Sequence, residues 1–146
     1  MNKSEVTLYR MLIRALSSDY IVLSKVRIED FVGVNKNELN EQRTFGLRGK
    51  IKSRHVDFRI CDLDSKPLMA VELDGGSHQN YHRIKRDTFV DRVYRDIGLP
   101  VKHIRSGSNF AEAIGGISRD LNREALENKQ SLKTAKPPQY NPRATL

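Results

Sequence analysis

Two stretches decide the fold of this chain: VDFRI at residues 56–60 and AVELDGGSH at residues 70–78. Each is a short apolar run that contains acids, Asp57 in the first and Glu72 and Asp74 in the second. The turn-forming segment DLDSKP lies between them, so the sequence predicts two antiparallel strands joined as a hairpin. Because burying an unpaired carboxylate costs free energy, acids inside such strands need a partner.

The predicted hairpin brings these acids together. Glu72 and Asp74 are two residues apart on one strand and therefore share a face of the sheet. A turn midway between the two runs places Asp57 opposite the neighbourhood of Glu72 and Asp74. Carboxylates this close repel one another unless a cation lies between them, and all-oxygen ligands suit Mg²⁺ or Mn²⁺. The alternative interpretation is a set of surface ion pairs with Arg59 and Arg83.

Further helices and strands are predicted on both sides of this hairpin. In chain order we expect a helix at about 4–16, strands at 20–28, 54–62 and 68–74, a helix at about 81–97, a strand at 100–104 and a helix at about 109–126. A helical crossover before the last strand favours a parallel pairing with the strand before it. The predicted fold class is α/β, with a central mixed four-stranded sheet flanked by helices. The polar stretch at 33–53 is a long connection that is functional, mobile or contains a short helix.

Composition and charge restrict the class of protein. The 146 residues are expected to form one domain over 1–128 and a basic, proline-containing disordered tail over 129–146. A net charge of +8 favours nucleic acid as a partner, although solubility alone explains the charge of many basic proteins. No apolar run approaches the roughly 18–20 residues that span a bilayer, and the first residues lack the apolar part of a signal peptide. With Cys61 as the single cysteine, a reducing cytoplasm is the expected location.

Two residues outside the hairpin are candidates for the same site. Glu5 lies at the end of the apolar stripe of the first helix. It is either a further carboxylate of the metal site or a first-turn acid that the helix dipole favours. His78 follows the acidic strand by four residues, where it could act as a base or bind phosphate. The alternative for His78 is a solvated surface histidine.

Two basic runs flank the candidate site. Arg83, Lys85 and Arg86 begin the helix at about 81–97, and Arg54 ends a run that also contains Arg48, Lys50 and Lys52. Both runs could hold the phosphates of DNA, and both could equally be solvated charged surfaces. The buried stripe of the helix at 81–97 is expected to comprise Phe89, Val90, Val93 and Ile97.

The motifs resemble those of a bacterial family of uncharacterised domains that is assigned to the PD-(D/E)XK nuclease superfamily and is related to the very-short-patch repair endonucleases. The resemblance rests on HVDF at 55–58, VELDG at 71–75 with His78, KRD at 85–87 and GLP at 98–100 before Arg105. It covers residues 4–105, and the expected element order matches the restriction-endonuclease-like αβββαβ core of that superfamily.

The resemblance implies a metal-dependent DNA endonuclease or nickase. Asp57 matches the first aspartate of the motif, Glu72 matches its second acid, and Glu5 matches the acid that these nucleases often carry on their first helix. Mg²⁺ or Mn²⁺ would be the cofactor, with Asp57, Glu72 and Asp74 as ligands. The implied partner is DNA, and a homodimer or a larger mobile-element or defence complex is compatible with this function.

One departure from the motif affects the expected activity. The lysine of the motif is Asp74 here, and that lysine orients water or stabilises charge at the phosphate. Its role passes to a residue such as His78, Lys85 or Arg86, or the metal is bound differently, or activity is lost. A catalytically degenerate nuclease-fold module that binds nucleic acid or a partner protein is therefore the alternative function.

Overall fold

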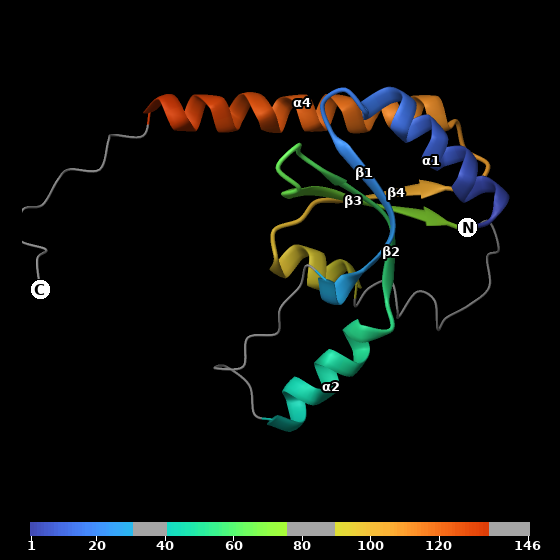
Figure 1. The fold of residues 1–146 in the computed structure, drawn as a ribbon, viewed down its shortest axis with the longest axis vertical. Helices are drawn as coiled ribbons and strands as arrows, with labels where there is room; N and C mark the ends of the chain where they lie inside the picture. The colour runs from blue at the N-terminus through green and yellow to red at the C-terminus, as the bar shows by residue number, and fades with distance from the viewer. Residues whose placement is uncertain (31–40, 76–89, 135–146) are drawn as a thin grey trace, which may run out of the picture.

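The computed structural model describes residues 1–30, 41–75 and 90–134, and its centre is a four-stranded mixed sheet (Figure 1). The strands lie in the order β1-β2-β3-β4. They are β1 (Ile21–Arg27), β2 (His55–Cys61), β3 (Pro67–Asp74) and β4 (Val101–Arg105). The helices are α1 (Lys3–Leu16), α2 (Glu41–Lys52) and α4 (Phe110–Thr134), with a short 3-10 helix η1 (Ile28–Asp30) and a helical segment over 90–96. The predicted α/β class, with a mixed four-stranded sheet flanked by helices, is confirmed.

Strands β2 and β3 form the predicted antiparallel hairpin. Phe58 pairs with Val71, so the next position along the ladder brings Asp57 opposite Glu72. The turn is closed by Asp62, whose side chain accepts hydrogen bonds from the backbone N–H groups of Asp64 and Lys66. This register is what the two apolar runs and the turn between them predict.

The outer strands add one antiparallel and one parallel pairing. Strand β1 runs antiparallel to β2, whereas β4 runs parallel to β3. The parallel pairing follows from the crossover that returns the chain to the same edge of the sheet. It places His103 beside Glu72 and Arg105 beside Asp74.

Helices α1 and α4 pack together on one face of the sheet (Figure 1). Both helices contribute apolar residues at helical spacing to one buried cluster with the sheet. Its helical members are Leu8, Leu12 and Leu16 of α1 and Ile114, Ile117 and Leu121 of α4. The helix predicted at about 109–126 therefore packs on the sheet through this apolar side.

A second buried cluster lies around the helical segment over 90–96, and here one core prediction is wrong. Val90 and Val93 pack against this cluster as predicted, but Ile97 is 42 % exposed. The segment ends at residue 96 and Gly98 turns the chain with φ 68°, so Ile97 lies in the turn. Tyr94, which was not predicted as a core residue, is completely buried in this cluster. Phe89 lies outside the described residues.

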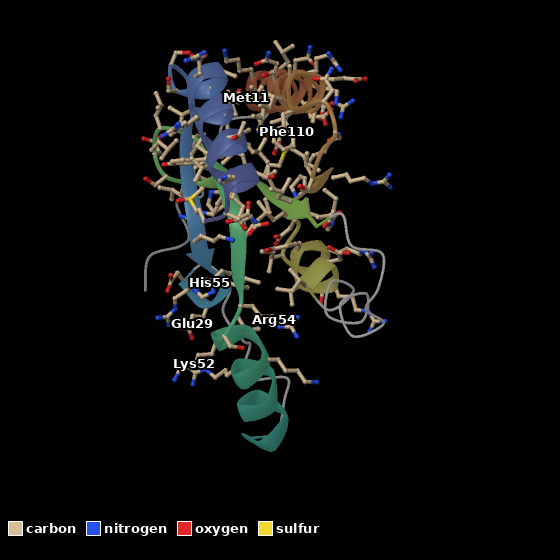
Figure 2. All side chains as sticks on the ribbon, turned by 90° about the vertical axis from the view of Figure 1, so that its right-hand side faces the viewer. Met11, Glu29, Lys52, Arg54, His55 and Phe110 are labelled. Carbon is tan, nitrogen blue, oxygen red and sulfur yellow. The ribbon has the colours of Figure 1, made fainter. Side chains whose placement is uncertain are left out.

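The polar stretch at 33–53 was expected to be functional, mobile or to contain a short helix, and the structure places helix α2 within it. Helix α2 stands away from the sheet, at the opposite end of the molecule from α1 and α4 (Figures 1 and 2). Helix α4 also extends further than predicted, because no glycine or proline occurs between Gly116 and Pro137 to end it. Residues 129–134 of the predicted tail are therefore helical, and 135–146 lie outside the described residues. Among the described helices, none has the length and apolar character needed to cross a membrane.

Candidate active site

Lys25 joins two of the predicted site acids. Its ammonium Nζ lies 2.9 Å from Oε1 of Glu5 and 2.5 Å from Oδ1 of Asp57. The neighbouring pairs of the β1–β2 ladder put Lys25 directly opposite Asp57, while Glu5 reaches it from the start of α1. Three elements that are distant in the sequence thus meet at one cation.

Lys25 was not predicted as a site residue. The prediction of this strand used only its β-branched residues, and the pairing of β1 with β2 is not a hairpin that local sequence reveals, since α2 lies between the two strands. A signal was nevertheless present, because a lysine in the middle of an apolar strand needs a partner as much as an acid does.

The backbone of Lys25 is in the left-handed region, with φ 52°. For a residue other than glycine this conformation costs roughly 1–2 kcal/mol. Burial lowers the pKa of Lys25, but the hydrogen bonds that its ammonium group donates to Asp57 and Glu5 outweigh that effect and raise the pKa above its ordinary value. The Lys25 side chain is therefore a cation held by two carboxylates, and the backbone of the same residue is strained.

Of the two roles that the sequence left open for Glu5, the structure shows the first-turn acid, which also contacts Lys25. Its Oε2 accepts a hydrogen bond from the backbone N–H of Asn2 at 2.8 Å, and Asn2 Oδ1 accepts from the Glu5 N–H at 2.9 Å, which completes a capping box at the start of α1. Its other oxygen contacts Lys25. Burial raises the pKa of Glu5, but the hydrogen bonds donated by Lys25 and Asn2 lower it by a larger amount. The net pKa is therefore below its ordinary value. Glu5 is thus an ionised first-turn residue of α1 that completes the capping box and positions Lys25.

Asp57 is held from both neighbouring strands. Oδ1 accepts from Lys25 of β1, and Oδ2 accepts from the backbone N–H of Leu73 on β3 at 2.9 Å. A carboxylate oxygen can accept more than one hydrogen bond or metal contact. Asp57 is therefore oriented by the sheet itself and retains lone pairs for a further ligand.

Glu72 lies beside Asp57 in a poorly solvated place. The hydroxyl of the buried Tyr94 donates a hydrogen bond to Glu72 Oε1 at 3.2 Å. Burial, and then the negative charge of Asp57, raise the pKa of Glu72 to about 7. Two carboxylates this close repel each other when both are ionised, so a cation that binds both of them stabilises the ionised forms.

Asp74 takes a different partner. Its Oδ1 lies 3.3 Å from Nδ1 of His103, whose Nε2 lies 3.1 Å from Oδ1 of Asp91. Burial lowers the pKa of His103, but both carboxylates raise it, so the net pKa is above the ordinary value. His103, which the sequence analysis did not select, thus links the end of β3 to the helical segment over 90–96.

The predicted set of three acids is therefore brought together in part. Asp57 and Glu72 are adjacent, whereas Asp74 turns to His103. In residues 1–30, 41–75 and 90–134 no three His, Cys, Asp or Glu side chains are grouped so as to hold a metal. Two carboxylates nevertheless fit Mg²⁺, which usually keeps several waters and binds proteins through one or two carboxylates plus substrate phosphates.

The basic residues of the prediction divide into two groups. Arg54 is partly buried and lies at the junction of α2 and β2, near Lys52 and His55 (Figure 2). Arg48, Lys50 and Lys52 of the same run are exposed on α2. The residues of the other run, Arg83, Lys85 and Arg86, and the predicted His78 lie outside the described residues.

The fold and site define an α/β domain with an acid–lysine cluster, formed by Glu5 of α1, Lys25 of β1, Asp57 of β2 and Glu72 of β3, at one place on a mixed sheet. The chain belongs to the family described as "Protein of unknown function (DUF2726)", which matches residues 1–119 and so includes all four strands and the cluster. An uncharacterized protein of Haemophilus influenzae is 27% identical over 128 residues, which are 88% of this chain and 64% of that protein. The chain thus spans less than two thirds of the length of this relative. No solved structure shows significant similarity to the chain.

Proposed function

We propose that this chain is a metal-dependent phosphodiesterase of the PD-(D/E)XK type, a DNA endonuclease or nickase. The observation that carries the proposal is the placement of Lys25 against Asp57, with Glu72 next along the sheet. Two acids can hold a divalent metal, and a lysine beside them can stabilise negative charge on a phosphate.

In this proposal Asp57 and Glu72 hold Mg²⁺ or Mn²⁺. The bound ion would supply Lewis acidity toward a phosphate oxygen and lower the pKa of a water molecule. The protein orients Asp57 through the backbone of Leu73, and Tyr94 fixes one oxygen of Glu72. Asp74 lies on the same strand and contacts His103, which is the β4 neighbour of Glu72 in the register of the sheet.

Lys25 takes the role of the motif lysine that is replaced by Asp74. Its ammonium group is fixed beside Asp57, where it can donate a hydrogen bond to a phosphate oxygen and stabilise the negative charge that develops in the transition state. Glu5 contributes by holding Lys25 in place and keeping it protonated. In this proposal the positive charge at the site comes from β1, whereas the lysine of the motif would lie on β3.

The substrate proposed is DNA, on the grounds of the net charge of +8 and the motif. His78 is proposed to move protons, and Arg54, Arg83, Lys85 and Arg86 to hold phosphates. A cytoplasmic location, and a homodimer or a larger mobile-element or defence complex, complete the proposal.

Nicking of supercoiled plasmid in Mg²⁺ or Mn²⁺ tests this function. We expect the wild-type protein to nick, and Asp57→Asn, Glu72→Gln and Lys25→Met each to lose at least about 100-fold in rate, as removal of a transition-state contact does. Glu112→Gln removes an exposed acid from α4 and serves as the matched control. Equal nicking by all variants, or none by the wild type, would contradict the proposal.

A second candidate function is a nucleic-acid-binding module without catalysis. Lys25 already forms ion pairs with Asp57 and Glu5, which favours a site that is held together without metal. Such a module would bind DNA equally well with and without EDTA. Calorimetric Mn²⁺ binding that disappears in Glu72→Gln would exclude it.

A further inference from the structure

The carboxyl ends of the parallel strands β3 and β4 lie beside the acid–lysine cluster and carry a cation that the proposed function does not use. In the register of the sheet, His103 is the neighbour of Glu72, and Arg105 is the neighbour of Asp74. Residues two apart on a strand share a face of the sheet, and so do lateral neighbours on adjoining strands. Arg105 therefore shares a face with Glu72, and one strand spacing and two residues along the strand put their Cα atoms about 8 Å apart.

A contact with α1 places Arg105 at the same end of the molecule as Lys25. Ser106 Oγ lies 3.4 Å from Ser4 Oγ, so the first turn of α1 packs against the residue that follows Arg105. The same turn of α1 supplies Glu5, which contacts Lys25. Figure 1 likewise shows the start of the chain beside the ends of β3 and β4. The register of the sheet and the contact with α1 thus place Arg105 independently beside the cluster.

The backbone of Arg105 is fixed on both sides. Its carbonyl accepts hydrogen bonds from the backbone N–H of Ser108 at 3.1 Å and from the Ser108 hydroxyl at 2.7 Å. The N–H of Ser106 donates to the carbonyl of Asp74 at 2.8 Å, which ties the end of β4 to the end of β3. Gly107 has φ 86°, a conformation that glycine adopts without cost and that this turn requires. The point from which the Arg105 side chain projects is therefore well defined.

The side chain of Arg105 is exposed, and the acid next to it in the sheet has another partner. Asp74 directs Oδ1 to His103. Within residues 1–30, 41–75 and 90–134 the guanidinium group of Arg105 forms no ion pair. A planar guanidinium group binds two oxygens of a phosphate at once, which makes arginine well suited to the backbone of nucleic acid.

We propose that Arg105 binds the DNA phosphate next to the one that is cleaved and so holds the strand across the ends of β3 and β4. Lys25 lies on β1 and Arg105 on β4, so the two cations flank the carboxylates of Asp57 and Glu72 from opposite sides. Lys25 is therefore placed for the reacting phosphate, and Arg105 for its neighbour. This inference deepens the proposed function and rests on it for the identity of the ligand as DNA.

Fluorescence anisotropy of a short labelled DNA duplex in EDTA measures this contact without cleavage. We expect Arg105→Gln to lose at least about tenfold in affinity, and the magnitude of the slope of log K against log salt to fall by about 0.9, the value for one phosphate contact. Arg105→Lys should keep the wild-type slope, because it keeps the charge. The control Arg14→Gln removes the same charge from the exposed side of α1, about 14 Å along the helix from Glu5, and should stay within about twofold.

The proposal is overturned if Arg105→Gln binds as tightly as the wild type, if its salt dependence is unchanged, or if Arg14→Gln loses as much. Circular dichroism and the melting temperature of Arg105→Gln confirm that a loss of affinity is not a loss of fold. The outcome is separable from that of the proposed function. If Arg105→Gln binds more weakly but no protein nicks plasmid, the nuclease function fails and the phosphate contact stands. If the wild type nicks and Arg105→Gln binds DNA equally well, this inference alone fails.

Discussion

At the residue scale, Lys25 has a left-handed backbone at the same place where its ammonium group joins Glu5 to Asp57. Strain of this kind persists only where the surrounding structure enforces it, and functional sites are where it is most often retained. The strand neighbours of Lys25 pair regularly on both sides, so the distortion is confined to the residue that carries the charge.

The comparison of Lys25→Gly with Lys25→Ala separates the strain from the charge. Both variants lose the ion pairs, but glycine adopts a positive φ without cost. We expect Lys25→Gly to be more stable than Lys25→Ala by about 1 kcal/mol in urea denaturation, and both to lose nicking activity. An alanine variant as stable as the glycine variant would show that no strain is stored there.

At the element scale, the sequence predicted the β2–β3 hairpin because everything that determines its register is local. Alternating apolar residues, a turn rich in Asp and Ser, and two acids of fixed spacing determine the contact between Asp57 and Glu72. Lys25 and Tyr94 could not be found this way. Lys25 depends on the pairing of β1 with β2 across an inserted helix, and Tyr94 depends on where the chain turns at Gly98.

His103 connects two elements by contacts that its protonation strengthens. Its pKa is raised above 6.5 by Asp74 and Asp91, against the effect of burial. A group with a raised folded pKa stabilises the fold fully below its unfolded pKa, and that stabilisation is lost as pH rises through the folded value. The link between β3 and the segment over 90–96 is therefore strongest under mildly acidic conditions.

His103→Gln should consequently lower the melting temperature more at about pH 5.5 than at about pH 8.5. His55→Gln replaces an exposed histidine on β2 and is the control, for which we expect no such difference. If His103→Gln lowered the melting temperature equally at both pH values, the charge of the imidazolium would contribute nothing to the contact between β3 and the segment over 90–96.

At the scale of the whole molecule, Glu72 couples folding to pH. Its pKa rises from 4.5 to about 7, first through burial and then through Asp57. The folded state therefore keeps a proton on Glu72 that the unfolded chain releases at lower pH. Stability from this group is complete below about pH 4.5, falls as pH rises toward about pH 7, and is lost above it.

Urea denaturation at about pH 5 and pH 8 measures this coupling, which amounts to at most about 3 kcal/mol. His103 has the same sign and an overlapping range, so the quantity to compare is the difference between wild type and Glu72→Gln. We expect Glu72→Gln to lose less stability than the wild type over this interval. Equal losses would show that Glu72 is ionised in the folded protein throughout.

The central claim is that Asp57 and Glu72 together hold a divalent metal beside Lys25. A crystal structure of the protein soaked in Mn²⁺, with anomalous diffraction data, tests it most directly. We expect an anomalous peak in contact with carboxylate oxygens of both Asp57 and Glu72, with Lys25 still beside the site. Carboxylates without a peak, with Lys25 as the cation on Asp57 and Glu72 still bonded to Tyr94, would contradict it.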